Sequence, residues 1–268
     1  MLKDITFGQF LPLSSFLNKM DARVKLLICF ALIIFIFIAG NFASLGIMAL
    51  MTIAVMIASK VPVKMYLKSL KPILLLVLLT AVLNVFYIKG NGAPLISYGF
   101  IQIYKEGLIQ ALFVAIRIVL LVIISGSLTY STSPTALTDA IEHLLTPLAK
   151  LGVDTHTFAM MMTIALRFIP TLIEETDKIS SAQKARGSDM DSGSVMQKIK
   201  SVLPILIPLL AGSIRRATEL ADAMECRCYH GGKGRTRLKI LKTGYRDYIA
   251  IALTIVALSA IITLNILL

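Results

Sequence analysis

Two thiols, one guanidinium group and one imidazole lie close together in the last quarter of this 268-residue chain. They belong to Cys226, Arg227, Cys228 and His230, within the stretch ADAMECRCYHGGKGRTR. Thiolate and imidazole are common zinc ligands, and neighbouring thiols can also form a redox pair. Because the chain has only three cysteines and three histidines, this cluster is its first candidate for chemistry.

The surrounding pattern disfavours a zinc site and a disulfide. The residues before Cys226 follow a helical pattern, and side chains two positions apart on a helix diverge by about 200°. Cys226 and Cys228 would then point apart, a fourth zinc ligand is missing nearby, and a disulfide would need an oxidising compartment. The sequence also lacks HExxH, GxSxG and GxxxxGK[ST] motifs. We therefore predict no metal site, no bound cofactor and no catalytic residue.

The composition indicates an integral membrane protein. Hydrophobic residues make up 57% of the chain, charged residues make up 16%, and the mean hydropathy is +0.82. These values are too apolar for an ordinary soluble domain. A membrane helix needs about 20 apolar residues to cross about 30 Å of hydrocarbon. Five segments approach or exceed this length: 26–40, 41–59, 72–88, 108–129 and 248–268.

Basic residues predict how these spans are oriented. Arg23 and Lys25 precede the first span, and one loop without acidic residues carries Lys60, Lys64, Lys68 and Lys71. The positive-inside rule places both segments in the cytoplasm. The N-terminus and residues 131–247, with sixteen lysines and arginines from Lys150 to Arg246, then also fall inside.

The chain thus divides into membrane helices in 1–130, a cytoplasmic segment 131–247 and a last membrane helix 248–268. We expect no removable signal peptide. The net charge of +12 is explained by contact with anionic lipid head groups and requires no nucleic acid.

Three helical patterns occupy the cytoplasmic segment. The first begins at Ser133-Pro134, and the second follows Asp154 and continues to Gly187. The third contains two prolines and is predicted to end at Gly231-Gly232. The expected fold is an all-α integral membrane protein with about five transmembrane helices and about three cytoplasmic helices.

The second and third of these helices end in similar sequences. AQKARG, residues 182–187, aligns with AMECRC, residues 223–228, and this places Arg186 over Arg227. Small residues flank each arginine: Ala185 and Gly187 in the first copy, Cys226 and Cys228 in the second. Small flanks let a partner approach the backbone, and the guanidinium is suited to binding carboxylates. Ordinary helix capping would explain either end alone, so the repetition is what favours docking.

The paired ends resemble the Ala-Arg-Gly motifs of the transmembrane T component of energy-coupling factor transporters, which import vitamins and metals in prokaryotes. MDARVKLL, residues 20–27, is similar to the family's entry motif, and ALRFIP, residues 165–170, is similar to its second coupling helix. The first Ala-Arg-Gly motif matches fully. In the second, cysteines replace alanine and glycine, and the loss of this glycine is why we expect the helix to continue to Gly231-Gly232.

The resemblance implies a non-enzymatic scaffold in the prokaryotic cell membrane. In this family the T component joins two cytoplasmic ATPase subunits, identical or different, to a substrate-binding S component. Arg186 and Arg227 would each dock into one ATPase, with Ala185, Gly187, Cys226 and Cys228 as small neighbours. ATP and Mg²⁺ would be bound by the ATPases. The imported substrate would be a micronutrient, with a vitamin favoured.

A self-sufficient carrier or channel is the alternative function. Such proteins usually place ionisable residues along a route inside the bilayer. Arg117, near the middle of the predicted fourth span, is the strongest residue of this kind. A structural role also explains it, because a buried arginine can snorkel or bind the backbone carbonyls of a neighbouring helix. Uptake by this chain alone would favour the carrier.

Overall fold

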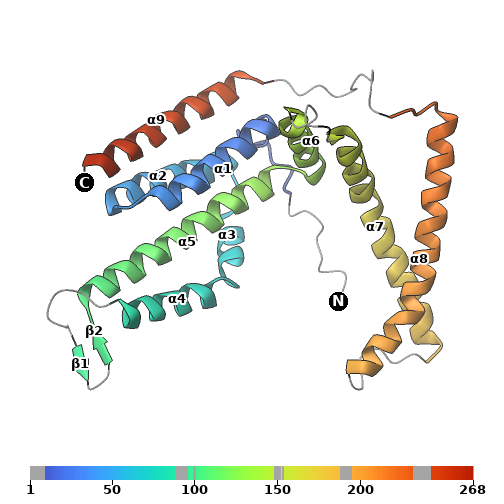
Figure 1. Ribbon diagram of the computed structural model, residues 1–268, viewed down its shortest axis with the longest axis horizontal. Coiled ribbons are helices and arrows are strands. Elements are labelled where there is room, and N and C mark those ends of the chain that lie inside the picture. Colours follow the sequence, from blue (N-terminus) through green and yellow to red (C-terminus); the bar gives the residue numbers. More distant parts are fainter. Residues whose placement is uncertain are drawn as a thin grey trace. The chain divides into compact units, whose positions relative to one another are not determined.

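The computed structural model describes residues 10–88, 96–98, 101–147, 152, 154–187, 195–231 and 243–267. The chain forms two compact units (Figure 1). The membrane unit comprises the described residues of 8–140 and 240–268, and the α7–α8 unit comprises the described residues of 141–239.

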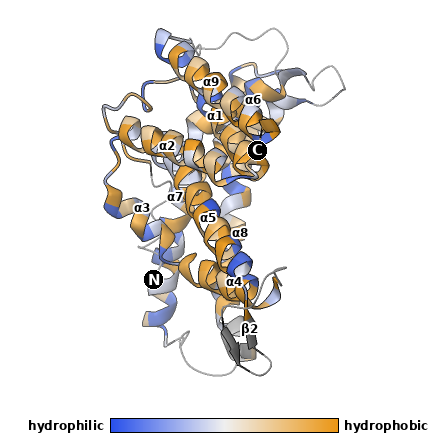
Figure 2. Ribbon diagram, turned by 90° about the vertical axis from the view of Figure 1, so that its left-hand side faces the viewer, coloured by the Kyte–Doolittle hydropathy of each residue, from blue (hydrophilic) through white to orange (hydrophobic). Residues whose placement is uncertain are grey.

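Helices build nearly all of the membrane unit. Its predicted spans correspond to α1 (Ala22–Ile38), α2 (Phe42–Ser59), α4 (Leu74–Tyr87), α5 (Lys105–Ser131) and α9 (Tyr245–Leu267). The short helix α3 (Val63–Leu70) lies between α2 and α4, and α6 (Pro134–Leu145) follows α5. Strands β1 (Ile96–Tyr98) and β2 (Ile101–Ile103) add a small antiparallel hairpin. Figure 2 shows that hydrophobic residues dominate these helices, and the predicted all-α membrane class is confirmed.

Some helices that were not predicted as membrane spans are also long and apolar enough to cross a membrane. In the part of the chain that the structure describes, the qualifying helices are α2, α5, α7 (Thr155–Ala185), residues Ser201–Cys226 of α8 (Val195–Cys226), and α9. The pair α3–α4 qualifies as one bent span. With 17 residues, or about 26 Å, α1 is marginally short. Both α7 and α8 were predicted to be cytoplasmic, because the positive-inside rule and the sixteen basic residues from Lys150 to Arg246 place residues 131–247 inside.

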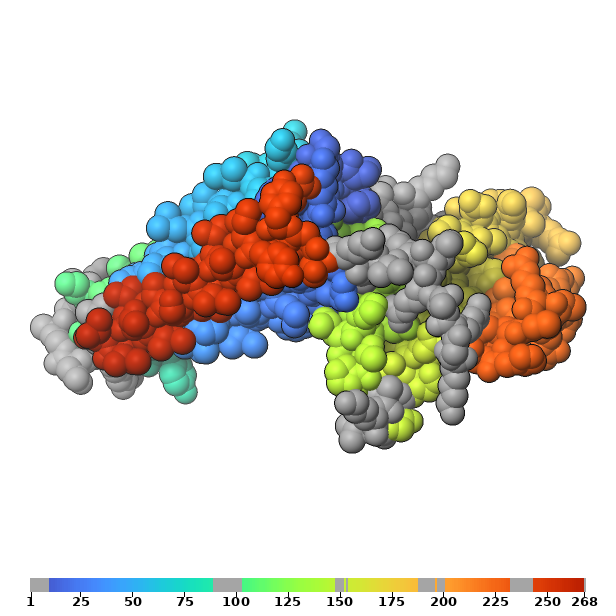
Figure 3. Space-filling view, turned by 90° about the horizontal axis from the view of Figure 1, so that it is seen from above, coloured from blue at the N-terminus to red at the C-terminus, as the bar shows by residue number. Residues whose placement is uncertain are grey.

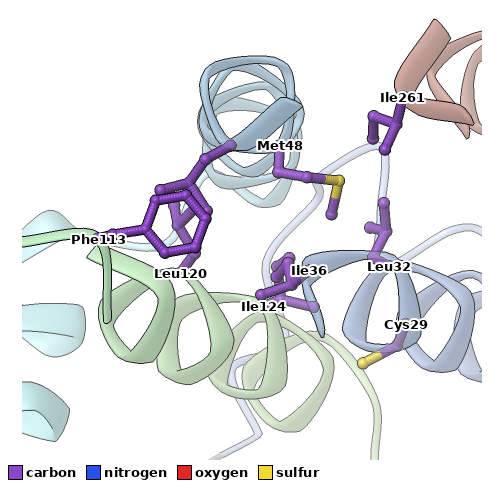
Figure 4. Close-up of a cluster of buried hydrophobic side chains, with 9 residues drawn as sticks. Cys29, Leu32, Ile36, Met48, Phe113, Leu120, Ile124 and Ile261 are labelled. Atoms are coloured by element: carbon purple, nitrogen blue, oxygen red, sulfur yellow. The ribbon is translucent and has the colours of Figure 1, made fainter. Parts of the chain in front are cut away.

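One hydrophobic core joins α1, α2, α5 and α9 (Figure 4). Its innermost side chains are Leu32 and Ile36 of α1, Met48 of α2, Ile124 of α5 and Ile261 of α9. Figure 3 shows α9, in red, lying along the blue helices α1 and α2. By contrast, α4 packs on α5 and buries none of its residues fully, so its leucines remain available to lipid.

Two polar side chains hold the turn between α1 and α2. Arg117 of α5 donates from Nη2 to the carbonyl oxygen of Ala39 at 2.6 Å. Asn265 of α9 donates to the carbonyl oxygen of Ile38 at 2.9 Å. Both oxygens belong to the last turn of α1, where helical carbonyls have no partner within their own helix. Arg117 therefore lies level with the end of α1, and this geometry suits the structural role.

Candidate functional site

Local sequence signals predict where α6 and α7 begin. At the start of α7, the Asp154 carboxylate accepts from Thr157 N at 3.1 Å and from Thr157 Oγ1 at 2.6 Å. These hydrogen bonds lower the pKa of the exposed Asp154 carboxyl. At the start of α6, Ser133 Oγ accepts from Ala136 N at 3.2 Å, with Pro134 as the first helical residue. The predicted starts of both helices are confirmed.

The C-terminus of α7 is closed at Gly187. Arg186 is the cap residue, and its N–H donates to the carbonyls of Ala182 and Gln183 at 3.2 and 3.1 Å. Gly187 follows with a φ of +86°, and its N–H donates to the carbonyl of Lys184 at 3.0 Å. A left-handed residue just after the cap is the usual way to end a helix, and glycine adopts it without strain.

The C-terminus of α8 has the same design with cysteine in place of glycine. Cys228 has a φ of +55°, and its N–H donates to the carbonyl of Glu225 at 2.8 Å. Tyr229 N donates to the carbonyl of Met224 at 3.1 Å. This pair of bonds defines a Schellman motif, with Arg227 as the cap.

The prediction that α8 continues to Gly231-Gly232 is therefore wrong. The helix ends at Cys226, because the Schellman hydrogen bonds require only that residue 228 be left-handed. A non-glycine residue adopts that conformation at a cost of about 1–2 kcal/mol. Cys228 is also outside the helix, so the helical argument against its sharing a metal with Cys226 does not apply. In the described ranges, no three His, Cys, Asp or Glu side chains could together hold a metal ion.

Both arginine-bearing helix ends are exposed at the surface of the α7–α8 unit. All six residues of the two motifs are exposed: Ala185, Arg186, Gly187, Cys226, Arg227 and Cys228. Within the described residues of the α7–α8 unit, neither guanidinium group has an acidic partner. Each end thus presents a fork of N–H donors beside small side chains, suited to a carboxylate on another molecule.

Helices α7 and α8 pack side by side in opposite directions (Figure 1). Arg216 of α8 forms an ion pair with Glu175 of α7 at 2.6 Å. Glycine at 212 makes room for this contact, because a Cβ there would lie only 3.1 Å from Glu175 Oε1. Beside the ion pair, a cavity of about 290 Å³ is lined by apolar side chains that include Phe168 of α7 and Leu220 of α8.

Arg186 and Arg227 lie near opposite ends of this helix pair. Near the end of α7, Gln183 Nε2 donates to the carbonyl of Pro204 at 3.4 Å, so Arg186 is level with the first half of α8. From Pro204 to its last residue, Cys226, α8 continues for 22 residues, or about 33 Å. The antiparallel packing thus places two equivalent arginines near opposite ends of the pair, with about six helical turns of α8 between them.

Comparison with known proteins finds a matching family and relatives of similar length. Residues 13–238 match the family described as cobalt transport protein, CbiQ. The chain is 52% identical over 261 residues to the energy-coupling factor transporter transmembrane protein EcfT of Clostridium kluyveri, which covers 97% of each chain. The proteins of that name from Ruminiclostridium cellulolyticum and Bacillus subtilis are 47% and 40% identical over 265 and 258 residues, at least 96% of each chain.

The chain belongs to the family of energy-coupling factor transporter transmembrane proteins. The resemblance inferred from the two arginine motifs is therefore confirmed. As a member of this family, the chain is a transporter component rather than an enzyme. Its several apolar helices make it a multi-pass membrane protein.

The sequence patterns of this energy-coupling factor protein did not predict that Asp247 links the start of α9 to the start of α1. Asp247, at the start of α9, is 2% exposed and accepts from Asp21 N at 2.9 Å. Asp21 in turn caps α1 and forms an ion pair with Arg23 at 2.7 Å. Nearby, Lys25 Nζ donates to the carbonyl of Ser131 at the end of α5 at 2.9 Å. One signal was available, because Asp247 is the only acidic residue after Glu225.

Proposed function

We propose that this chain couples ATP hydrolysis by two cytoplasmic ATPase subunits to substrate uptake through a separate membrane-embedded S component. The observation that carries the proposal is the repetition of one exposed helix end. Arg186 and Arg227 occupy the same cap position, and each precedes a left-handed residue that stops its helix. An ordinary helix stop does not require this combination of exposed arginine and small neighbours twice.

The separation of the two arginines supports one ATPase at each end. A single docking groove does not span the approximately 33 Å of helix between the level of Pro204 and Cys226. Two grooves, one on each ATPase subunit, match two arginines. Movement of the ATPases toward or away from each other would then act on α7 and α8 from opposite ends. The Glu175–Arg216 ion pair would transmit this movement between the helices.

Contact with the S component is proposed for the apolar half of each coupling helix. Large hydrophobic side chains are exposed on the first part of α7, including Phe158 and Met161, and on α8, including Ile207, Leu210 and Ile214. Such contiguous apolar surface is typical of a site that contacts another protein or lipid. The charged C-terminal part of each helix would then contact an ATPase while its apolar part contacts the membrane subunit.

The proposed location is the prokaryotic cell membrane, with the N-terminus and residues 131–247 in the cytoplasm. The basic residues near the span ends support this orientation. ATP and Mg²⁺ would be bound by the ATPases, and this chain would bind no cofactor. We propose a micronutrient, with a vitamin favoured, as the imported substrate; cobalt is named in the description of the matching family.

The test is to express the complete transporter with Arg186→Ala, Arg227→Ala or both. Loss of a desolvated charged contact commonly weakens binding by about 2–5 kcal/mol. We expect each single variant to lose most of one ATPase contact and the double variant to lose both ATPases on purification. Lys184→Ala, an exposed basic residue two positions before Arg186, is the matched control. Wild-type co-purification and uptake by the double variant would reject the proposal.

A further inference from the structure

Helix α3 connects two membrane helices and carries a row of lysines. It follows α2 after Lys60, which ends that helix with a φ of +55°. It precedes α4 after a turn at residues 71–73, and the axes of α3 and α4 differ by 58°. Because α3 joins a membrane-spanning helix to a lipid-facing one, it must lie near the membrane surface.

Hydrogen bonds fix which side of α3 faces the protein. The hydroxyl group of Tyr66, 2% exposed, is hydrogen-bonded to Ser59 Oγ of α2 at 3.0 Å and to Ser127 Oγ of α5 at 2.9 Å. One turn further, the hydroxyl groups of Ser69 and Tyr130 are also hydrogen-bonded. Since Tyr66 reaches two different helices, α3 is not free to rotate about its axis.

This anchoring points the lysines away from the protein. Lys64 and Lys68 are two residues from Tyr66 and Lys71 is five residues from it. At about 100° per residue, each lies about 140–160° around the axis from the anchored tyrosine. All three side chains are exposed, as is that of Lys60. We call the surface formed by Lys64, Lys68 and Lys71 the α3 lysine face.

The length of α4 sets the depth of this face. With 14 residues, α4 is about 21 Å long and falls short of a hydrocarbon thickness of about 30 Å. The turn and the tilted α3 therefore cover the remaining hydrocarbon depth, and the long side chains of the α3 lysine face reach the level of the head groups. Val63 and Leu67, 59% and 61% exposed, lie beside the lysines and provide an apolar edge toward the acyl chains.

We propose that the α3 lysine face is a binding surface for the phosphate groups of anionic phospholipids. An ammonium group at head-group depth attracts anionic lipid, and each lysine strengthens the attraction by about fivefold. An acidic protein would also satisfy the charge. The apolar edge and the shortness of α4 favour lipid, because both place the lysines where phosphate groups are most concentrated. This surface is independent of the proposed docking of ATPases.

The test compares the complete transporter in nanodiscs of phosphatidylcholine that contain from 0 to 40% phosphatidylglycerol. Native mass spectrometry after release into mild detergent counts the phosphatidylglycerol molecules that remain bound. We expect wild-type protein to retain phosphatidylglycerol at mole fractions at which the triple variant Lys64→Gln, Lys68→Gln, Lys71→Gln retains little. The apparent lipid affinity should fall by about fivefold for each lysine removed.

Two matched variants complete the test. Replacing the same lysines by arginine keeps the charge and should keep the lipid. Lys178→Gln, at an exposed position of α7 away from the predicted ends of the membrane spans, removes a lysine elsewhere and should leave retention unchanged. Equal retention by wild type and the glutamine triple variant would overturn the proposal. If the glutamine triple variant retained lipid normally but lost the ATPases, the proposal would also be overturned, and the face would be assigned to an acidic protein.

Discussion

Gly187 and Cys228 occupy the same position in two helix ends that lie 41 residues apart in sequence. Each is the first residue after a capping arginine, and their φ angles are +86° and +55°. Each N–H donates to the carbonyl three residues earlier, Lys184 or Glu225. The cysteine therefore serves as a small left-handed residue, and the cluster that first suggested chemistry is a helix terminus with an exposed guanidinium group.

Substitutions at Gly187 and Cys228 should distinguish the effect of backbone strain on stability from the effect of the side chain on ATPase docking. Gly187→Ala places a Cβ on a left-handed residue, which we expect to destabilise the transporter by about 1 kcal/mol or more. Cys228→Gly removes that strain and should keep stability within about 1 kcal/mol of wild type while ATPase docking persists. For a chain of this size, 1 kcal/mol shifts the thermal midpoint by about 2–4 °C. A loss of docking in Cys228→Gly would show that the thiol itself is required.

The Glu175–Arg216 ion pair should matter more for coupling than for assembly. Both side chains are partly exposed, so Glu175→Gln should change stability by at most about 1 kcal/mol. We expect this variant to bind both ATPases and to hydrolyse ATP with fewer substrate molecules imported per ATP. Gly212→Ala should act in the same direction by displacing the carboxylate. An unchanged ratio of uptake to hydrolysis in both variants would remove the ion pair from the coupling route.

Among the acidic residues of the membrane unit, Asp247 should cause the largest loss of stability when it is replaced by alanine. Its two carboxylate oxygens accept from Asp21 N and from Gly244 N at 2.9 and 2.7 Å. Asp247→Ala leaves both donors without this acceptor, which we expect to cost about 1–3 kcal/mol per unsatisfied group and to lower the thermal midpoint. Asp222→Ala, which removes an exposed carboxylate of α8, is the control and should have little effect. Equal midpoints for the two variants would contradict this role.

Arg117 distinguishes the scaffold from the carrier. Arg117→Met removes the hydrogen bond to the Ala39 carbonyl, so we expect a lower thermal midpoint and a loss of uptake no larger than the loss of folded transporter. The chain reconstituted alone should import nothing. Abolished uptake with an unchanged midpoint, or uptake by the chain alone, would favour a transport route that passes Arg117.

Local signals in the sequence predicted the parts of the fold that depend on local chemistry. Asp154 begins α7 and Pro134 begins α6, because a capping carboxylate and a proline act within one turn. The apolar runs located α1, α2, α4, α5 and α9, because a membrane-spanning helix is marked by the apolar residues of its own segment. The end of α8 was mispredicted, since propensity disfavours a left-handed cysteine and does not register the two hydrogen bonds that impose it.

Contacts between distant residues were beyond the sequence patterns. The partner of Arg117 is 78 positions away, and the Asp21–Asp247 hydrogen bond joins residues 226 positions apart. Periodicity predicts which face of a helix is apolar but not which carbonyl lies opposite an arginine. For the candidate site, the sequence supplied the two motifs, whereas their equivalent backbone geometry and their placement at opposite ends of the helix pair required the structure.

Alkylation of Cys226 and Cys228 by a maleimide is the most direct test of docking. Both thiols are exposed beside Arg227, whereas Cys29, the third cysteine of the chain, is buried. We predict that alkylation of both is at least roughly tenfold slower in the complete transporter than in the isolated chain, because a docked ATPase covers them. Arg227→Ala should restore the fast rate. Equal rates in the isolated chain and the complete transporter would contradict the docking of an ATPase at this helix end.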